Sequence, residues 1–311
     1  MAVTASPATT GAPAPKGPLK LTPGRVTALV IGVPVALALV AQAAFSLLAP
    51  FAQGRYHVSY TAPASTRSVT VNSSGGQVSV RHLAHGPVTL AGTARYSFIR
   101  STFSTQVNGG DTAMNYHCAP LPTGSCGLDG TLSVPAGVSV SVNTDGADAT
   151  ASDISAPVTL HSAGGDLSAD HITGRLHLST EGGNIHLDTV TAPLTVSTLG
   201  GDIGAANVSS ATVTMSTSGG NIQATGVRSP ALTASTNGGD IEIVFSSVPV
   251  NVHVSTAGGN ITLVLPPGSQ EYNVKTHASG GNVSDALARN SASANTITAT
   301  TVGGDITLRQ G

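Results

Sequence analysis

The sequence contains no tryptophan, and aromatic residues make up only 3% and charged residues only 9% of its 311 positions. A chain so poor in large side chains cannot fill the wide core of an ordinary globular domain. Its hydrophobic content of 40% is nevertheless too high for a disordered chain. This composition, rich in glycine and in small and β-branched residues, favours many short strands packed around a narrow interior.

Acidic residues are absent from the first 110 positions, and all fifteen lie from Asp111 onward. The only charges within residues 1–55 are Lys16, Lys20, Arg25 and Arg55. Residues 56–311 therefore carry 13 − 4 = 9 cations against 15 anions, a net charge of −6. The clustered lysine and arginine that a protein needs to neutralise nucleic-acid phosphates are missing, so we expect no nucleic-acid partner.

The 23 residues from Val26 to Leu48 contain no charge. As a helix they would span about 34 Å, enough for a hydrocarbon core of about 30 Å, and a membrane helix tolerates Pro34. Three cations precede the segment and one follows it, which leaves the N-terminus in the cytoplasm. We therefore expect a flexible cytoplasmic tail over 1–25, a single membrane-spanning helix over 26–48 and an extracytoplasmic remainder. Cleavage after Ala43, at the end of an Ala-Gln-Ala motif, is the alternative, but the apolar residues that continue to Phe51 favour an uncleaved anchor.

The only two cysteines, Cys118 and Cys126, lie eight residues apart in the segment "CAPLPTGSC". Outside the cytoplasm such a pair is expected to form a disulfide. The alternative, a tetrahedral metal site, lacks a second pair of ligands, although His117 is adjacent.

One phrase recurs along the second half of the chain, as in "TVSTLGGDIGAA" from Thr195 to Ala206. The second glycines of the repeated phrase follow one another at steps of 18 to 23 residues, and Ala147 takes this place in a degenerate first copy. These corner glycines are Gly165, Gly183, Gly201, Gly220, Gly239, Gly259, Gly281 and Gly304. A fixed period near 20 residues is typical of a stacked-repeat fold.

Aliphatic residues recur seven positions before and two positions after each corner glycine, for example Leu194 and Ile203 around Gly201. Apolar and polar residues alternate around them, which indicates strands with one buried face. Antiparallel hairpins would not need the same residue class in every copy, whereas stacked coils do, because each side chain packs on its counterpart one coil away. We therefore predict an all-β fold, a parallel β-solenoid of about nine coils over 138–311, preceded by a β-rich capping region with the disulfide over 56–137 and by the membrane helix.

Each corner reads Gly-Gly-Asp/Asn. Here we expect glycine to supply a positive φ and to leave room for the neighbouring coils, and Asp or Asn to hydrogen-bond its own turn. The Asp/Asn column could instead bind calcium, but the calcium-binding nonapeptide is absent. Asp alternating with Asn also avoids most carboxylate repulsion, so we interpret the column as structural. Its members are Asp148, Asp166, Asn184, Asp202, Asn221, Asp240, Asn260, Asn282 and Asp305.

Over residues 68–311 the chain resembles a family of membrane-tethered proteins called putative adhesins, whose function is unknown and which are common in actinobacteria. The resemblance rests on "VTVNSSGGQVSV" (Val69–Val80), on "CGLDGTLSVPAGVSVSV" (Cys126–Val142) and on the serial Gly-Gly-Asp/Asn-Ile corners. It implies an extracytoplasmic β-solenoid and brings no catalytic residues.

We predict a protein that is not an enzyme and that serves adhesion, surface binding or envelope scaffolding, with no cofactor or metal. The membrane is its expected partner through the helix, together with cell-wall glycan or an envelope protein. A polysaccharide-cleaving enzyme is the competing class, but the repeats hold only Phe245 and Tyr272 as aromatics, and their glutamates lie in three separate copies. His161, His177 and His186 occupy different positions in their copies. Rows of Thr and Ser on the outward positions leave ice binding as a remote alternative.

Overall fold

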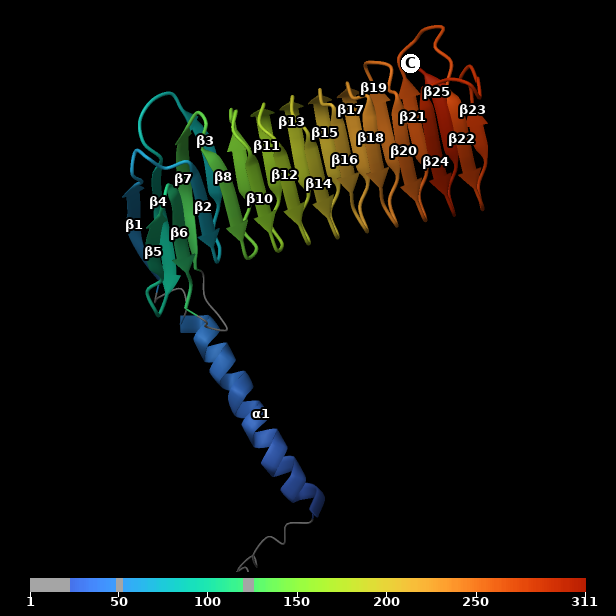
Figure 1. Cartoon of the computed structure of the whole chain (residues 1–311). Helices are drawn as coiled ribbons and strands as arrows, with labels where there is room; N and C mark the ends of the chain where they lie inside the picture. Colours follow the sequence, from blue (N-terminus) through green and yellow to red (C-terminus); the bar gives the residue numbers. More distant parts are fainter. Residues whose placement is uncertain (1–22, 49–52, 120–125) are drawn as a thin grey trace, which may run out of the picture. The chain divides into compact units, whose positions relative to one another are not determined.

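The computed structural model describes residues 23–48, 53–119 and 126–311, with the side chains of the helix described over 32–44 (Figure 1). The chain forms two compact units, Met1–Leu48 and Ala49–Gly311. The first contains the helix α1, Pro23–Leu48, with Pro34 inside it. Among the residues described, no helix combines the length and the apolar character needed to cross a membrane. The transmembrane span over 26–48 therefore stays a prediction, and most of the expected tail over 1–25 lies outside the described residues.

The second unit is built from two β-sheets, here named sheet A and sheet B. Sheet A contains β1 (Gln53–Thr61), β3 (Val78–Leu83), β4 (Thr89–Ser97), β7 (Gly127–Pro135), β9 (Ala149–Ser152), β11 (Leu167–Ile172), β13 (Ile185–Val190), β15 (Ile203–Val208), β17 (Ile222–Val227), β19 (Ile241–Phe245), β21 (Ile261–Leu265), β23 (Val283–Asp285) and β25 (Ile306–Gln310). Sheet B contains β2 (Ser68–Ser73), β5 (Thr102–Asn108), β6 (Asp111–His117), β8 (Ser139–Thr144), β10 (Val158–Ser162), β12 (Leu176–Thr180), β14 (Leu194–Thr198), β16 (Thr212–Ser216), β18 (Ala231–Ser235), β20 (Asn251–Thr256), β22 (Asn273–Ala278) and β24 (Thr296–Thr301).

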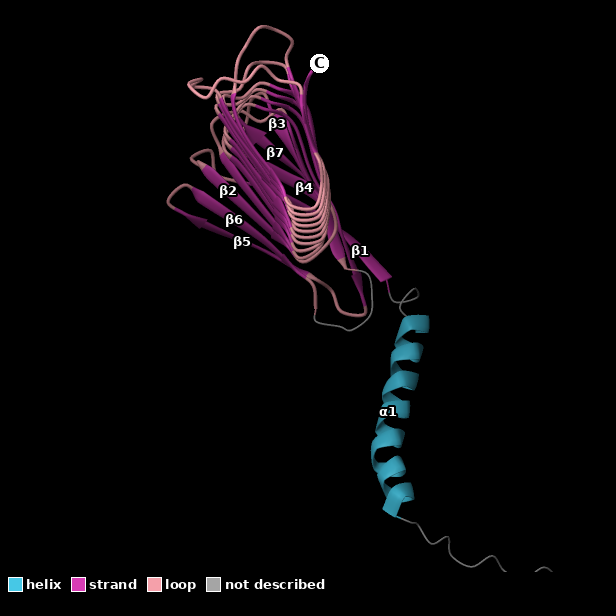
Figure 2. Cartoon of the chain, turned by 90° about the vertical axis from the view of Figure 1, so that its right-hand side faces the viewer, coloured by secondary structure: helices cyan, strands magenta, loops and turns pink. Residues whose placement is uncertain are grey.

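Each coil consists of one strand from sheet B, a corner that is Gly-Gly in most coils, and one strand from sheet A, and successive coils pair in parallel (Figures 1 and 2). The register stacks like positions on one another, as when Leu194 pairs with Leu176 on one side and with Val213 on the other. The predicted parallel, all-β, solenoid-like stacking is thus confirmed. The narrow interior that composition required is also present, because the side chains between the sheets are mostly Val, Leu, Ile and Ala.

At the two ends of the stack the spatial order of the coils differs from their order in the sequence. The coil β2–β3 belongs to the same repeat, and it lies between β6–β7 and β8–β9. At the other end β24–β25, the last coil of the chain, lies between β20–β21 and β22–β23. The first and last coils in sequence are therefore held between two neighbours each, which protects segments that would otherwise fray.

Three further strands lie beyond β6–β7 at the N-terminal end. Strand β4 pairs antiparallel with β7, and β1 pairs antiparallel with β4, so both extend sheet A. Strand β5 pairs antiparallel with β6 and extends sheet B. We name β1, β4 and β5 the cap strands. They end the parallel stack, and with it the repeat.

Candidate functional site

The corner glycines are required for a steric reason. A Cβ atom built on Gly201 would lie 2.0 Å from the carbonyl oxygen of Gly183, and one built on Gly183 would lie 2.1 Å from that of Gly165. None of the eight predicted corner glycines has a φ in the left-handed region. The expectation of positive φ is therefore wrong, and the expectation that no Cβ fits between coils is confirmed.

A buried threonine column joins the corners of successive coils. Thr198 donates a hydrogen bond from Oγ1 to the carbonyl oxygen of Gly183 at 2.9 Å and accepts one from the N–H of Gly201 at 3.1 Å. The same pair of bonds recurs at Thr180, Thr217, Thr236, Thr256 and Thr301. Each of these threonines is buried and donates its hydroxyl proton inside the structure.

The Asp/Asn column forms a second ladder on the outside of the corner. The N–H of Asn221 donates to Asp202 Oδ1 at 2.7 Å, and the N–H of Asp202 donates to Asn184 Oδ1 at 2.9 Å. These side chains therefore bond the backbone of the neighbouring coil, and the expectation that they bond their own turn is wrong. Within the described residues no group of three or more His, Cys, Asp or Glu side chains is arranged to hold a metal ion.

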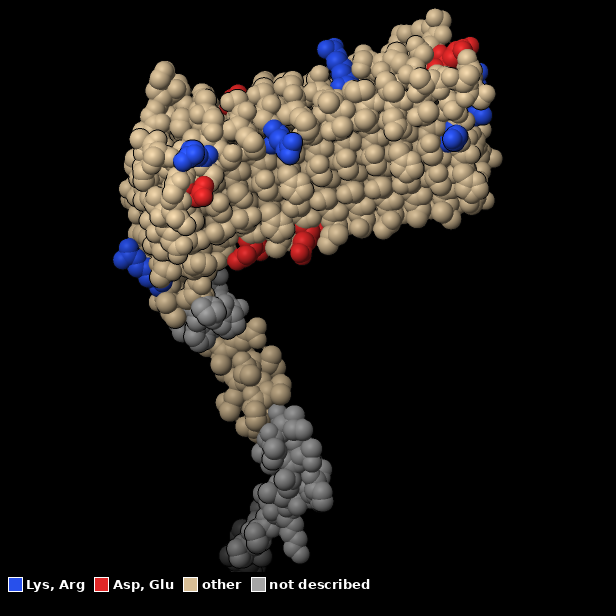
Figure 3. Space-filling view, viewed as in Figure 1, with Lys and Arg blue, Asp and Glu red and all other residues tan. Residues whose placement is uncertain are grey.

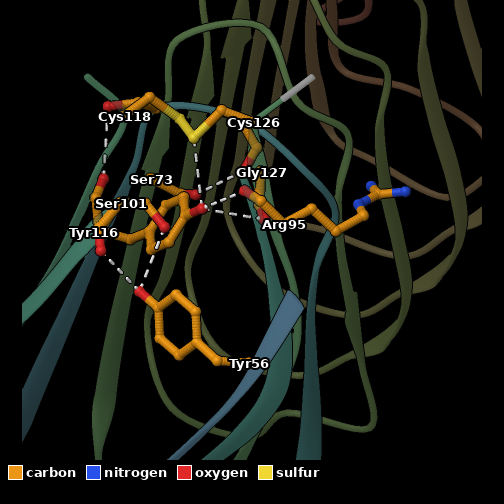
Figure 4. Close-up of a disulfide and its surroundings, with 10 residues drawn as sticks. Tyr56, Ser73, Arg95, Ser101, Tyr116, Cys118, Cys126 and Gly127 are labelled. Carbon is orange, nitrogen blue, oxygen red and sulfur yellow. Dashed lines mark hydrogen bonds between the residues drawn. A yellow bond between two sulfur atoms is a disulfide. The ribbon is translucent and has the colours of Figure 1, made fainter. Parts of the chain in front are cut away.

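The disulfide between Cys118 and Cys126 is present, as predicted (Figure 4). It joins the end of β6 to the start of β7, where the other coils have their Gly-Gly corner. The buried Tyr116 hydroxyl beside it donates toward the carbonyl oxygens of Arg95 at 2.8 Å and Gly127 at 3.1 Å. Burial raises the pKa of Tyr116 above its ordinary value. The disulfide and the tyrosine together close the corner of the outermost parallel coil.

A shallow groove of about 350 Å³ runs along the corner edge of sheet B. Outward-facing serines of β12, β14, β16 and β18 line one wall, and residues that precede the two glycines of each corner line the other. The lining residues are His161, Ser179, Thr180, Glu181, Ser197, Thr198, Leu199, Ser216, Thr217, Ser218, Ser235 and Asn237. Neighbouring serines lie one coil apart, about 4.8 Å, so we name this feature the hydroxyl groove.

Charged residues are few on the outer surface of sheet B, and Glu181 is the one charged residue that lines the groove. From β8 to β24 its strands contain one charged residue, Lys275 on β22, and Figure 3 shows few charged side chains over the coils. Thr195, Thr214 and Thr233 stack in register over three coils, flanked by His177 and His253. The flat threonine array that ice binding would need is therefore only three coils long.

The arrangement in the groove suits binding better than bond cleavage. Glycoside hydrolysis needs a pair of carboxylates, and Glu181 is the single carboxylate among the lining residues. His161 lies at one end of the groove, where its Nδ1 is 2.8 Å from Ser179 Oγ, whereas His177 lies on a neighbouring row and His186 on sheet A. The three predicted histidines are thus not brought together.

The sequence analysis missed one wall of the groove. The residues immediately before the Gly-Gly pair vary from coil to coil and include Glu181, Leu199 and Asn237. Leu199 was the signal available in the sequence, because an aliphatic residue stands there at a corner position outside the buried columns. In the structure Leu199 is 59% exposed.

A polar ridge on sheet A is the other unusual surface. Four non-glycine residues at the same position of neighbouring coils have positive φ: Asp153, His171, Thr189 and Asn207. This conformation is strained for the β-branched Thr189. The Asp170 carboxylate lies 2.9 Å from His171 Nδ1 and raises the pKa of this histidine. Hydrogen bonds from Asn207 and Thr189 hold the pKa of Asp188 below its ordinary value. The charged side chains of the ridge therefore find their partners within the ridge itself.

No curated protein sequence is significantly similar to the chain. A crystal structure described as a putative adhesin from Bacteroides fragilis is 10% identical, with a TM-score of 0.42, and the match covers 83% of this chain and 97% of that one. A putative cell adhesion protein from Clostridium sporogenes is 11% identical, with a TM-score of 0.29, and the match covers 83% of this chain and 100% of that one. The sequence profile named Toastrack DUF4097 matches residues 44–309, which is 309 − 44 + 1 = 266 of the 311 residues, and the chain therefore belongs to the Toastrack DUF4097 family.

Proposed function

We propose that this protein is a non-catalytic binding protein of the cell envelope. The helix over 26–48 anchors it in the membrane with the N-terminus in the cytoplasm, and the solenoid outside binds an extended glycan of the cell wall. The hydroxyl groove is the observation that carries the proposal. Adhesion and envelope scaffolding are the two biological roles that such binding would serve.

The chemistry of the groove supports a neutral polymer as ligand. Serine hydroxyls donate and accept hydrogen bonds, as sugar hydroxyls do, and the strands around the groove carry no charge that would select a phosphate or a carboxylate. Serine hydroxyls repeat along the four coils of the groove at about 4.8 Å. A chain of sugar rings lying along the groove could use several of them at once, so weak contacts would add to a useful affinity.

An extracytoplasmic location is supported by the disulfide and by the uncharged segment Val26–Leu48. Disulfides persist in oxidising compartments and are rare in the cytoplasm. A reporter that is active only outside the cytoplasm, fused after Gly311, tests the location. The fusion is expected to be active, and an inactive fusion would contradict the anchor.

Binding is tested with the full chain and insoluble cell-wall polysaccharide. Ser197→Leu combined with Ser216→Leu fills the groove. Gln223→Leu combined with Thr225→Leu places the same side chains on the exposed face of sheet A and is the control. The groove variant is expected to lose binding and the control to keep it, with no release of sugar. Equal binding by both variants would refute the groove, and release of soluble sugar would show the enzyme instead.

A further inference from the structure

The cap strands and their loops contain an excess of positive charge. From Gln53 to Pro135, which covers the cap strands and the two coils next to them, the sequence contains five arginines against the two acids Asp111 and Asp129. The residues from 136 onward contain 5 cations and 13 acids. The N-terminal end of the second unit is therefore basic, whereas its repeats are acidic, and Figure 3 shows blue side chains at the end that carries the cap strands.

An apolar loop projects from this basic end. Phe98 and Ile99, in the loop between β4 and β5, are 38% and 53% exposed. Phe98 has a φ of 59°, in the left-handed region, where a bulky residue is a genuine outlier. Backbone strain of this kind persists only where surrounding contacts hold it. We name residues 98–100 the cap loop.

Three arginines lie near the cap loop, and they differ in whether an acidic side chain neutralises them. Arg95 forms an ion pair with Asp129 at 2.8 Å. Arg55 is the cross-strand neighbour of Arg95. Arg100 lies over the ring of Tyr56 at 4.3 Å from its centroid. Arg55 and Arg100 have no acidic partner among the described residues, so their charges are available to an anion.

Tyr56 on β1 contacts the cap loop in two ways. The Tyr56 hydroxyl donates to the carbonyl oxygen of Ser101 at 3.0 Å. Tyr56 thereby fixes both the end of the cap loop and, through its ring, the guanidinium of Arg100. An apolar tip and a cation are thus presented together on a loop that contacts Tyr56 of β1.

Chain geometry relates the cap loop to the proposed anchor. Gln53, the first residue of β1, pairs with Ser97, which directly precedes the loop. Five peptide steps separate Leu48, the last residue of the helix, from Gln53. Even fully extended they span at most about 18 Å. The connecting chain is thus short enough for the cap loop to reach the surface at which the proposed anchor ends.

We propose that the cap loop is a membrane contact, in which Phe98 and Ile99 enter the interfacial layer and Arg55 and Arg100 bind the phosphates of anionic lipids. Aromatic and aliphatic side chains favour this layer when cations flank them, and basic residues add attraction to anionic headgroups. The inference rests on the proposed anchor for its geometry. Its chemistry comes from the loop alone.

The absence of tryptophan makes the test direct, because one introduced tryptophan is the only one in the protein. Ile99→Trp is compared with Val250→Trp, at an exposed residue of the repeats with a similar exposure of 46%. The full-length variants are reconstituted into vesicles of anionic lipid with brominated chains. Fluorescence from position 99 is expected to be quenched and blue-shifted, and fluorescence from position 250 to match that in water. Equal emission from both positions would overturn the proposal.

Charge variants and flotation separate this inference from the anchor. Arg55→Gln and Arg100→Gln should each reduce the ratio of docked to undocked loop about fivefold, and added salt should weaken docking in the parent. Quenching that ignores both changes would overturn the role of the arginines. If the full chain does not float with vesicles, the anchor is wrong. Ile99→Trp is then mixed with anionic vesicles, where quenching supports the lipid contact and unchanged emission overturns it.

Discussion

The two glycines of one corner should respond in opposite ways to the same small change. A Cβ on Gly201 would lie 2.0 Å from the Gly183 oxygen and 2.9 Å from the Asn184 nitrogen, whereas the nearest atom to a Cβ on Gly200 is 3.6 Å away. Real Cβ contacts below 3.0 Å essentially never occur, so Gly201→Ala forces the coils apart by about 3.0 − 2.0 = 1.0 Å. Gly200→Ala fits without movement.

The contacts at this corner give the size of the expected change in the free energy of unfolding. Separating the coils at this corner strains the bond from Thr198 Oγ1 to the Gly183 oxygen and the bond from the Asp202 N–H to Asn184 Oδ1, both 2.9 Å long. Each such bond contributes about 0.5–1.5 kcal/mol, and overpacking a tight interior costs about 1–3 kcal/mol. We expect Gly201→Ala to reduce the free energy of unfolding by about 2–6 kcal/mol, the sum of these terms. Gly200→Ala should raise it by about 0.4–1 kcal/mol, because alanine reduces the entropy of the unfolded chain.

Urea denaturation followed by far-ultraviolet circular dichroism measures both variants beside the parent protein. Hydrogen exchange then shows whether protection is lost on the strands next to the substituted corner. If Gly201→Ala and Gly200→Ala unfold at the same urea concentration, the coils are not in contact at the second glycine. The steric explanation of the repeat would then be refuted.

Tyr272→Phe should stabilise the protein by about 1 kcal/mol, because the buried hydroxyl of Tyr272 has no hydrogen-bond partner among the described residues. The matched Tyr116→Phe should destabilise the protein by about 1–2 kcal/mol, because it removes two hydrogen bonds. Equal effects in thermal melts would contradict this contrast. Reducing the single disulfide should lower protection of β6 and β7 in hydrogen exchange by about 2–3 kcal/mol, and unchanged exchange would show that the corner is held without it. Under oxidation, Ser255→Cys with Thr300→Cys should crosslink, because these residues pair on adjacent coils about 4.8 Å apart. Ser255→Cys with His277→Cys should not, and the reverse result would show that the coils stack in sequence order.

The sequence was informative wherever one residue class had to stack on itself. Aliphatic positions recur because Leu194, for example, packs against Leu176 and Val213 in the adjacent coils. This requirement is visible in a single sequence, and it predicted the strand positions, the parallel pairing and the register. The disulfide was predictable from spacing and expected compartment.

The prediction failed where two physical causes leave the same residue in the sequence. Glycine is used both for positive φ and for close backbone approach, and the sequence does not separate the two. Gly201 illustrates the second cause, and Gly76, with a φ of 90°, the first. The hydroxyl groove was missed for a related reason. Its variable wall, with Leu199 next to Ser218, has no period that a repeat alignment would reveal.

The order of the coils at the C-terminal end was, by contrast, encoded in the sequence. In sequence order the last three members of the Asp/Asn column are Asn260, Asn282 and Asp305, which breaks the alternation. In space Asp305 lies between the two asparagines, since its N–H donates to Asn260 Oδ1 and its carboxylate accepts from the N–H of Asn282.

Spatial order therefore restores an unbroken alternation from Asp166 to Asn282. A carboxylate acceptor makes a stronger bond than an amide oxygen, and over this stretch the bonds to Asp are 2.7 Å long against 2.8–2.9 Å for those to Asn. Two carboxylates on adjacent coils would repel each other by about 3 kcal/mol at an effective dielectric of 20. Alternation gives every second coil the stronger bond and avoids the repulsion. Insertion of the last coil before β22–β23 is thus the arrangement in which the column keeps both advantages.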